Sequence, residues 1–184
     1  MQYQITQRRQ RGLTLIELLL VLVVVLAIAV TGFILFGQTS ESQRSQQAQQ
    51  ALLSVGAGVG KVVSGRNFAG ISNAVLIQAA VVPENLISGV APTQTLVNPW
   101  GGAITVSPSG IASGTNNTYQ VQFAAVPRSG CTSLLAATAV NFYRVQAGAT
   151  VLINRDADDI EATAVDIAAA CNAELNTITW TATG

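Results

Sequence analysis

Residues 8–17 combine basic side chains, a glycine and one acid at the head of an apolar stretch. Three arginines and no acid precede Gly12, Leu13 follows it, and Glu17 stands five positions after the glycine. Glu17 stands at the head of an apolar stretch, where an unpaired carboxylate costs about 2.5–3.5 kcal/mol. We therefore expect a cationic partner for Glu17.

The other groups able to do chemistry do not form a catalytic set. The chain has no histidine, which excludes Ser-His-Asp and Cys-His catalytic groups and the commonest zinc ligand. One acidic run comprises Asp156, Asp158, Asp159 and Glu161. It lacks the glycine and the terminal glutamate of an EF-hand loop, so we interpret the acids as first-turn residues of a helix ending at Cys171. No enzyme, cofactor or metal site is predicted.

A membrane-length apolar run follows Glu17. Leu18 to Phe36 are nineteen residues without a charge, and a helix of this length spans about 28 Å, close to the hydrocarbon thickness of a bilayer. The run accounts for much of a composition that is 49% hydrophobic and only 10% charged. Because the arginines precede it, residue 1 is expected in the cytoplasm. A secretory signal peptide cleaved after Ala29 is the alternative.

The sequence from Arg8 to Leu18 resembles the class III signal of type IV prepilins. In that family a leader peptidase cuts after the glycine on the cytoplasmic side and methylates the new terminal amine. The resemblance implies cleavage between Gly12 and Leu13 and N-methylation of Leu13. It also implies that Glu17 pairs with the terminal amine of an adjacent subunit during assembly. Pairing with the amine of its own chain is the alternative.

The predicted organisation has three parts. Residues 1–12 are a leader peptide, residues 13–37 a hydrophobic transmembrane and assembly helix, and residues 38–184 a periplasmic or extracellular globular domain. Removal of the leader leaves six basic and nine acidic side chains, a net charge of −3. Such a chain has no overall basic field, so no nucleic-acid partner is expected.

Apolar periodicity and turn residues predict the elements of the globular part. Residues 48–63 continue the helical pattern with one apolar stripe, so one helix is expected from about Thr14 to Ser64, roughly 75 Å long. Further predicted elements are a helix over Ser72–Val81, a turn at Asn98–Gly102, strands at Ala103–Val106 and Tyr119–Phe123 joined by a loop over Ser107–Thr118, strands at Asn141–Gln146 and Thr177–Ala182, and a helix over Asp159–Cys171. The fold class is α+β, with the long N-terminal helix packed on an antiparallel sheet in two layers.

A second resemblance concerns the C-terminal part. Cys131 and Cys171, the Asn-Pro-aromatic-Gly-Gly turn and the terminal strand are similar to type IVb pilins, such as bundle-forming pilins and the thin pilins of conjugative plasmids. Two cysteines in an exported domain predict a disulfide worth about 3–5 kcal/mol, with two buried thiols as the alternative. In the resembled family this region lies on the surface of the fibre.

These features together predict a structural subunit of a type IV pilus for adhesion, aggregation or conjugative contact. The expected partners are other copies of the chain, the leader peptidase and methylase, and the inner-membrane assembly machinery. The precursor is expected to cross the inner membrane once, and the assembled form to be extracellular. Two alternatives stay open, a type II secretion pseudopilin or minor pilin, and a tethered enzyme or binding domain.

Overall fold

The computed structural model describes residues 15–112, 114–156 and 161–183, and the side chains of residues 30–39 are not among those described. The chain divides into two units, Met1–Ser40 and Glu41–Gly184. The expected cleavage site at Gly12 and Leu13 lies outside the described residues. The side chains of residues 30–36, at the end of the predicted apolar run, are also outside the description. In the described part of the chain, no helix is both long and apolar enough to cross a membrane.

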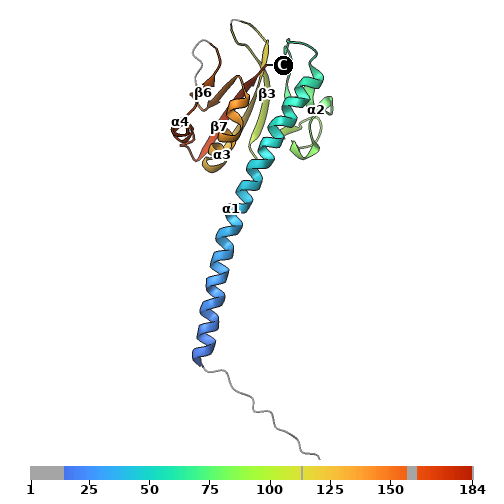
Figure 1. The fold of residues 1–184 in the computed structure, drawn as a ribbon. Helices are drawn as coiled ribbons and strands as arrows, with labels where there is room; N and C mark the ends of the chain where they lie inside the picture. Colours follow the sequence, from blue (N-terminus) through green and yellow to red (C-terminus); the bar gives the residue numbers. More distant parts are fainter. Residues whose placement is uncertain (1–14, 113, 157–160, 184) are drawn as a thin grey trace, which may run out of the picture. The chain divides into compact units, whose positions relative to one another are not determined.

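Helix α1 runs from Leu15 to Val62, close to the bounds predicted from the sequence (Figure 1). In the second unit its buried residues recur at spacings of three and four, so they form one stripe on one side of the helix. The hydrophobic ones, each at most 4% exposed, are Ala48, Ala51, Leu52, Val55 and Val59, and Ser45 and Gly58 are buried as well. Val62 and Val63, expected in the same stripe, are only partly buried against the core.

The segment after α1 contains short elements. Ser72 caps helix α2 (Asn73–Gln78), since its side chain accepts a hydrogen bond from the backbone N–H of Val75. This helix ends before the predicted limit at Val81, and Ala80 has a positive φ of 52°, which a continuing α-helix excludes. The elements that follow were not predicted: the 3₁₀ helix η1 (Glu84–Leu86) and strands β1 (Ile87–Ser88) and β2 (Thr95–Val97).

The described residues form a seven-stranded antiparallel sheet in the order β1-β2-β3-β4-β7-β5-β6. Figure 1 shows β3, β7 and β6 in this order across the sheet. The bounds of the five longer strands are β3 Ala103–Ser109, β4 Thr118–Pro127, β5 Arg144–Ala147, β6 Thr150–Asn154 and β7 Leu175–Ala182.

The register of β3 and β4 confirms the predicted antiparallel pair and corrects the loop between them. Val106 lies opposite Val121, as the alternation required, but the pairing continues to Ser109 opposite Thr118. The loop expected over Ser107–Thr118 was therefore too long, because alternating serines supply the solvent side of a longer strand. The strand expected from Asn141 starts only at β5, since residues 139–141 form the 3₁₀ helix η2 (Ala139–Asn141).

One face of the sheet and the helices α1 and α3 (Arg128–Thr138) share a single core. Trp180 of β7 is fully buried and packs edge-on against Phe123 of β4, with ring centroids 5.2 Å apart. Its indole N–H donates to Oγ1 of Thr138 at 3.1 Å, which satisfies the polar atom and ties α3 to the sheet. The predicted fold class, a two-layer α+β arrangement, is confirmed.

Two helices differ from the sequence prediction. Helix α3 was not predicted, because a segment beginning Arg-Ser-Gly-Cys-Thr-Ser is poor in residues that favour helix. Helix α4 spans Ala164–Ala170, shorter than the predicted Asp159–Cys171. It starts where Thr163 and Asp166 form a reciprocal capping box. The capping box therefore sets the start of α4, which the spacing of apolar residues alone did not indicate.

Candidate functional site

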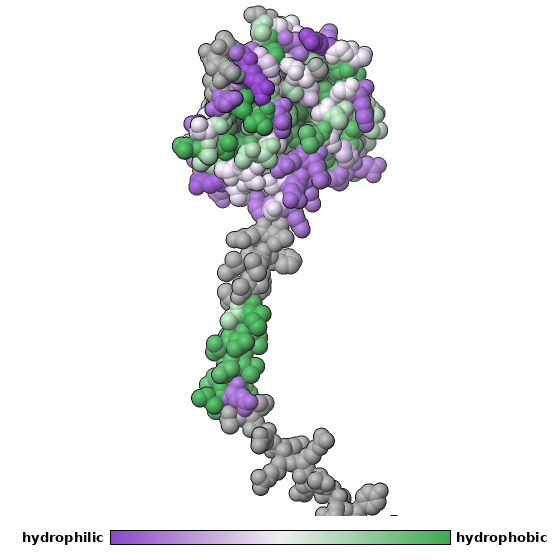
Figure 2. All heavy atoms as spheres, in the orientation of Figure 1, coloured by the Kyte–Doolittle hydropathy of each residue, from purple (hydrophilic) through white to green (hydrophobic). Residues whose placement is uncertain are grey.

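The described start of α1 exposes an almost wholly apolar surface. The large hydrophobic side chains between Leu15 and Ile28 are 48–79% exposed. Figure 2 shows this part of the helix covered by hydrophobic residues. A contiguous apolar surface of this kind requires lipid or other protein chains as its surroundings. Glu17 is the one charged residue in the described segment 15–29, and it too is exposed.

In the second unit, Glu41 joins three elements. Its Oε1 accepts a hydrogen bond from the indole N–H of Trp100 at 3.1 Å and another from the hydroxyl of Ser129 at 3.2 Å. The Trp100 ring also lies against Gly130, where a β-carbon would be 2.5 Å from the ring carbon Cζ2. One carboxylate therefore connects α1 with the turn before β3 and with the first turn of α3.

The turn that presents Trp100 is built around the side chain of Asn98. Its Oδ1 accepts from the backbone N–H of Trp100 at 2.9 Å and of Gly102 at 3.1 Å, and its Nδ2 donates to the carbonyl of Ala124 at 2.7 Å. A β-carbon at Gly102 would lie 1.9 Å from that same carbonyl oxygen, so glycine is required there. The turn predicted at Asn98–Gly102 is confirmed.

Cys131 and Cys171 form a disulfide with 5.8 Å between their Cα atoms. It joins α3 to the residue that ends α4, and both cysteines are fully buried. The guanidinium of Arg128 donates to the carbonyl of Asn172, a second link between the same two regions. The disulfide-bounded region expected from the sequence is therefore present.

The acidic run does not act as one group. Asp156 accepts a hydrogen bond from the hydroxyl of Tyr143 at 3.0 Å, which raises the pKa of Tyr143. Asp158 and Asp159 lie outside the described residues, and Glu161 precedes α4. Among the described residues, no three acidic, cysteine or histidine side chains are grouped so that they could hold a metal ion.

The acid in the first turn of α4 is Asp166, so the interpretation of Asp156 and Glu161 as first-turn residues was wrong. The Asp166 carboxylate accepts from the backbone N–H of Thr163 at 3.0 Å and from its hydroxyl at 2.6 Å. These hydrogen bonds lower the pKa of Asp166, because they stabilise the ionised form.

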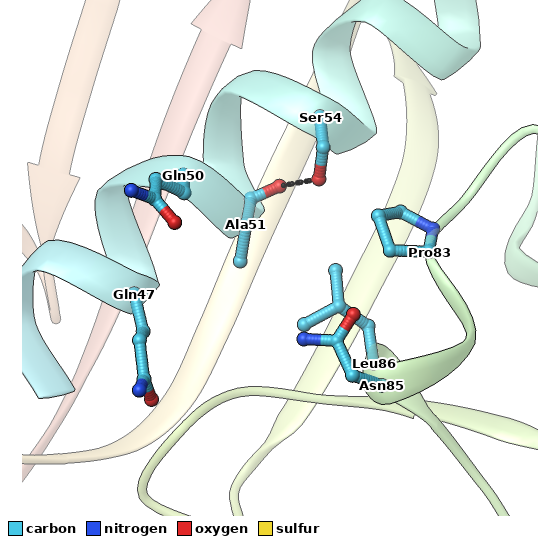
Figure 3. Close-up of a pocket in the computed structure, with 7 residues that line it drawn as sticks. All are labelled: Gln47, Gln50, Ala51, Ser54, Pro83, Asn85 and Leu86. Carbon is cyan, nitrogen blue, oxygen red and sulfur yellow. Dashed lines mark hydrogen bonds between the residues drawn. The ribbon is translucent and has the colours of Figure 1, made fainter.

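A pocket of about 160 Å³ lies between α1 and η1. Figure 3 shows its lining residues, which are Gln47, Gln50, Ala51, Ser54, Pro83, Asn85 and Leu86. The hydroxyl of Ser54 donates to the carbonyl of Ala51 at 2.9 Å, and no lining residue could act as its general base. Hydrogen bonding to hydroxyls or amides is possible there, but the pocket has no catalytic set.

The sequence did not reveal the contacts around Glu41. Glu41 is the first charged residue after the apolar run, and Trp100 is the aromatic residue of the predicted turn, so both stood out individually. Their contact spans 59 residues of sequence, and no local pattern signals such a pairing.

Two family models match the chain. Residues 42–183 match the model described as PilS N terminal, a range that coincides closely with the second unit. Residues 7–33 match the prokaryotic N-terminal methylation motif, which covers the predicted cleavage site and the exposed apolar helix.

A named relative and two solved structures are similar to the chain. The major structural subunit of the bundle-forming pilus of Escherichia coli O127:H6 (strain E2348/69 / EPEC) is 27% identical over 134 residues, covering 70% of this chain and 65% of that protein. The match thus spans less than two thirds of the relative. A type IVb pilin from Salmonella typhi has a TM-score of 0.58 at 24% identity, covering 78% of this chain and 99% of that one. TcpA, a type IV pilin from Vibrio cholerae El Tor biotype, has a TM-score of 0.60 at 15% identity, with coverages of 76% and 98%. These two structures share the fold.

Proposed function

Because the chain belongs to the PilS family of type IV pilins, we propose that it is the structural subunit of a pilus, made as a precursor and polymerised into an extracellular fibre. The observation that carries the proposal is the exposed apolar helix of residues 15–29 with Glu17 as its one charge, which lies within the match to the methylation motif. Such a surface is unsuited to water and suited to burial among identical helices. The role is structural, and the chain supplies no reaction.

Processing precedes assembly in this proposal. A leader peptidase removes residues 1–12 by cutting between Gly12 and Leu13, and the amine of Leu13 is methylated. Residues 13–37 then hold the chain in the inner membrane with its N-terminus in the cytoplasm, and residues 38–184 lie outside. Support comes from the arginines before Gly12 and from the match of residues 7–33 to the methylation motif.

Glu17 sets the register of assembly. A carboxylate that is buried among apolar helices loses its hydration, and this free-energy cost is offset only when a cation lies beside it. The terminal amine of Leu13 in a neighbouring subunit is such a cation, created only after cleavage. An incoming subunit is then accepted at the depth where the amine and the carboxylate meet, and other depths leave a buried charge unpaired.

The first test is the intact mass and the N-terminal sequence of the protein in material sheared from the cell surface. We expect a chain that starts at N-methylated Leu13. A chain starting at Val30 would mean conventional secretion and would end the pilin proposal. The abundance of the chain in the same material separates a main fibre subunit from a minor pilin or a secretion pseudopilin, and the name of the E. coli relative supports the main subunit.

The second test isolates Glu17. In cells whose only copy is Glu17→Ala, we expect normal cleavage but little or no sheared fibre. Glu84→Ala is the matched control, since Glu84 is an exposed acid of the second unit and its loss should leave fibre yield unchanged. Normal fibres from the Glu17→Ala cells would disprove the pairing.

A further inference from the structure

A groove on the second unit runs along the flank of α1. It consists of two hollows of about 290 and 350 Å³ that share Gly56 and Tyr119. The first hollow lies between α1 and the residues around Phe142 and Ala182, and the second continues toward Arg66. Because the hollows share residues on both walls, they form one continuous depression, here called the α1 groove.

The α1 groove is lined mainly by apolar or small residues. Leu53 on its rim is 63% exposed and adds apolar surface beside the depression. Gly60 has open space where its β-carbon would stand, and at Gly56 the nearest atom to such a carbon is the Tyr119 hydroxyl, 3.2 Å away. The missing side chains keep the depression open along the helix. A partner with a narrow apolar ridge would fit it.

The charges at one end of the α1 groove are positive. Arg66 lines the groove and is exposed, and Lys61 follows Gly60 on α1 and is exposed. None of the lining residues is acidic. The occupant should therefore combine apolar side chains with neighbouring carboxylates.

Helix α4 has those properties. Val165 is 76% exposed, and Ala168 and Ala169 are exposed at the positions three and four residues later, so they form one apolar ridge. The exposed acids Glu161 and Asp166 flank that ridge. Within the chain α4 packs against α3 and β6, at the edge of the sheet away from α1 (Figure 1), so the ridge itself has no cover.

We propose that the ridge of α4 in one copy docks in the α1 groove of a second copy, with the acids beside α4 facing Lys61 and Arg66. This inference rests on the proposed function, because it supposes that copies of the chain assemble. The complementarity of shape and of charge selects a second copy over an unrelated partner.

The two surfaces are different patches of the same molecule. When two copies bind through unlike patches, one α4 ridge and one α1 groove stay free on the pair. Further copies can therefore add, and they form a helical filament unless the copies close into a ring. A fibre subunit needs this kind of contact. The contact would also place the disulfide-bounded region of one copy against the helix of the next.

Cross-linking tests the contact directly. In the full chain, Ala57→Cys places a thiol on the α1 groove and Val165→Cys places one on the ridge of α4. We expect oxidation of sheared fibres carrying both changes to give a ladder of covalent oligomers. Ala57→Cys with Val90→Cys is the matched control, because Val90 is 80% exposed but lies on the loop between β1 and β2. That pair should give no ladder.

Charge exchange gives a second, independent readout. Arg66→Glu should lower the yield of fibre about tenfold, since it places like charges in contact. Glu161→Arg in the same chain should restore most of that yield. In the control, Arg44→Glu is combined with Glu161→Arg. Arg44→Glu should not restore the fibre yield that Glu161→Arg loses, because Arg44 is an exposed cation that does not line the α1 groove.

The outcomes separate this inference from the proposed function. Abundant fibres without a ladder, together with unchanged yield for Arg66→Glu, would overturn the docking and leave the pilus assignment intact. Absence of fibres from the unaltered chain would overturn the assignment itself. The contact would be established by two results together. Ala57→Cys with Val165→Cys gives a ladder while the control pair gives none, and Glu161→Arg restores the fibre yield of Arg66→Glu.

Discussion

The indole N–H of Trp100 donates to Oε1 of Glu41 at 3.1 Å and thereby joins α1 to the turn before β3. Three local features position the indole ring and the carboxylate for this hydrogen bond. Asn98 holds the turn, Gly130 leaves room for the indole ring, and Ser129 donates to the same carboxylate oxygen at 3.2 Å. Glu41 is the first residue of the second unit, so this contact holds the start of that unit's part of α1 against the turn before β3.

Removal of the Glu41 carboxylate should weaken the second unit. Glu41→Ala leaves the Trp100 indole N–H and the Ser129 hydroxyl without their acceptor, and we expect a loss of about 1–2 kcal/mol in unfolding free energy. Urea unfolding of the full chain in detergent, followed by tryptophan fluorescence, measures it. Glu174→Ala removes an exposed acid that follows α4 and should change stability by less than about 0.5 kcal/mol. Equal losses for both variants would contradict the role given to Glu41.

Two glycines should respond to alanine in opposite directions. Gly130→Ala puts a methyl group 2.5 Å from the Trp100 ring, so the ring must move and its bond to Glu41 is lost, at a cost of about 1–3 kcal/mol. Gly60→Ala meets nothing within 4 Å in the last turn of α1 and should stabilise the protein by up to about 1 kcal/mol. Thermal unfolding of both variants in the same detergent gives the comparison. A loss for Gly60→Ala would show that the groove beside it is filled in the isolated chain.

Most of this architecture could be predicted from local patterns. The apolar stripe of α1 repeats every three or four residues, and Tyr119–Phe123 alternates, so sequence periodicity was enough for the main helix and the central strand pair. The turn at Asn98–Gly102 was predictable because its geometry demands asparagine and glycine. Elements with weak local preference were missed or misplaced.

The missed features depend on contacts distant in sequence. Helix α3 is stabilised by the burial of Leu134 and Leu135 and by the disulfide. The sequence of the helix itself indicates neither the burial nor the disulfide partner. Strands β1 and β2 are too short for a period to be read, and they exist because they pair at the sheet edge. The same reason hides the Glu41–Trp100 contact, which only the folded chain creates.

The disulfide should contribute strongly to stability. It closes a loop across a sequence separation of 40, for which the chain-entropy model gives about 4 kcal/mol. The variant Cys131→Ala with Cys171→Ala avoids unpaired thiols, and we expect its urea midpoint to fall accordingly with little change in far-UV circular dichroism. Reduction of the unaltered chain should give a loss of similar size. A midpoint unchanged in both experiments would mean that packing around α3 and α4 holds without the bond.

Acid should weaken the cap of α4 through Asp166. Its hydrogen bonds with Thr163 lower its pKa below the ordinary value of 3.8, so the ionised carboxylate stabilises the folded state above about pH 4. That contribution is lost as the pH falls through the lowered pKa. The difference in unfolding free energy between the unaltered chain and Asp166→Asn should therefore be constant above about pH 5 and shrink toward zero in stronger acid. Thr163→Ala removes the hydroxyl that donates to the carboxylate but keeps the backbone N–H, and it should reduce the difference above about pH 5. A difference that persists undiminished at pH values well below the ordinary pKa would show that the Asp166 carboxylate does not stabilise the cap by its charge.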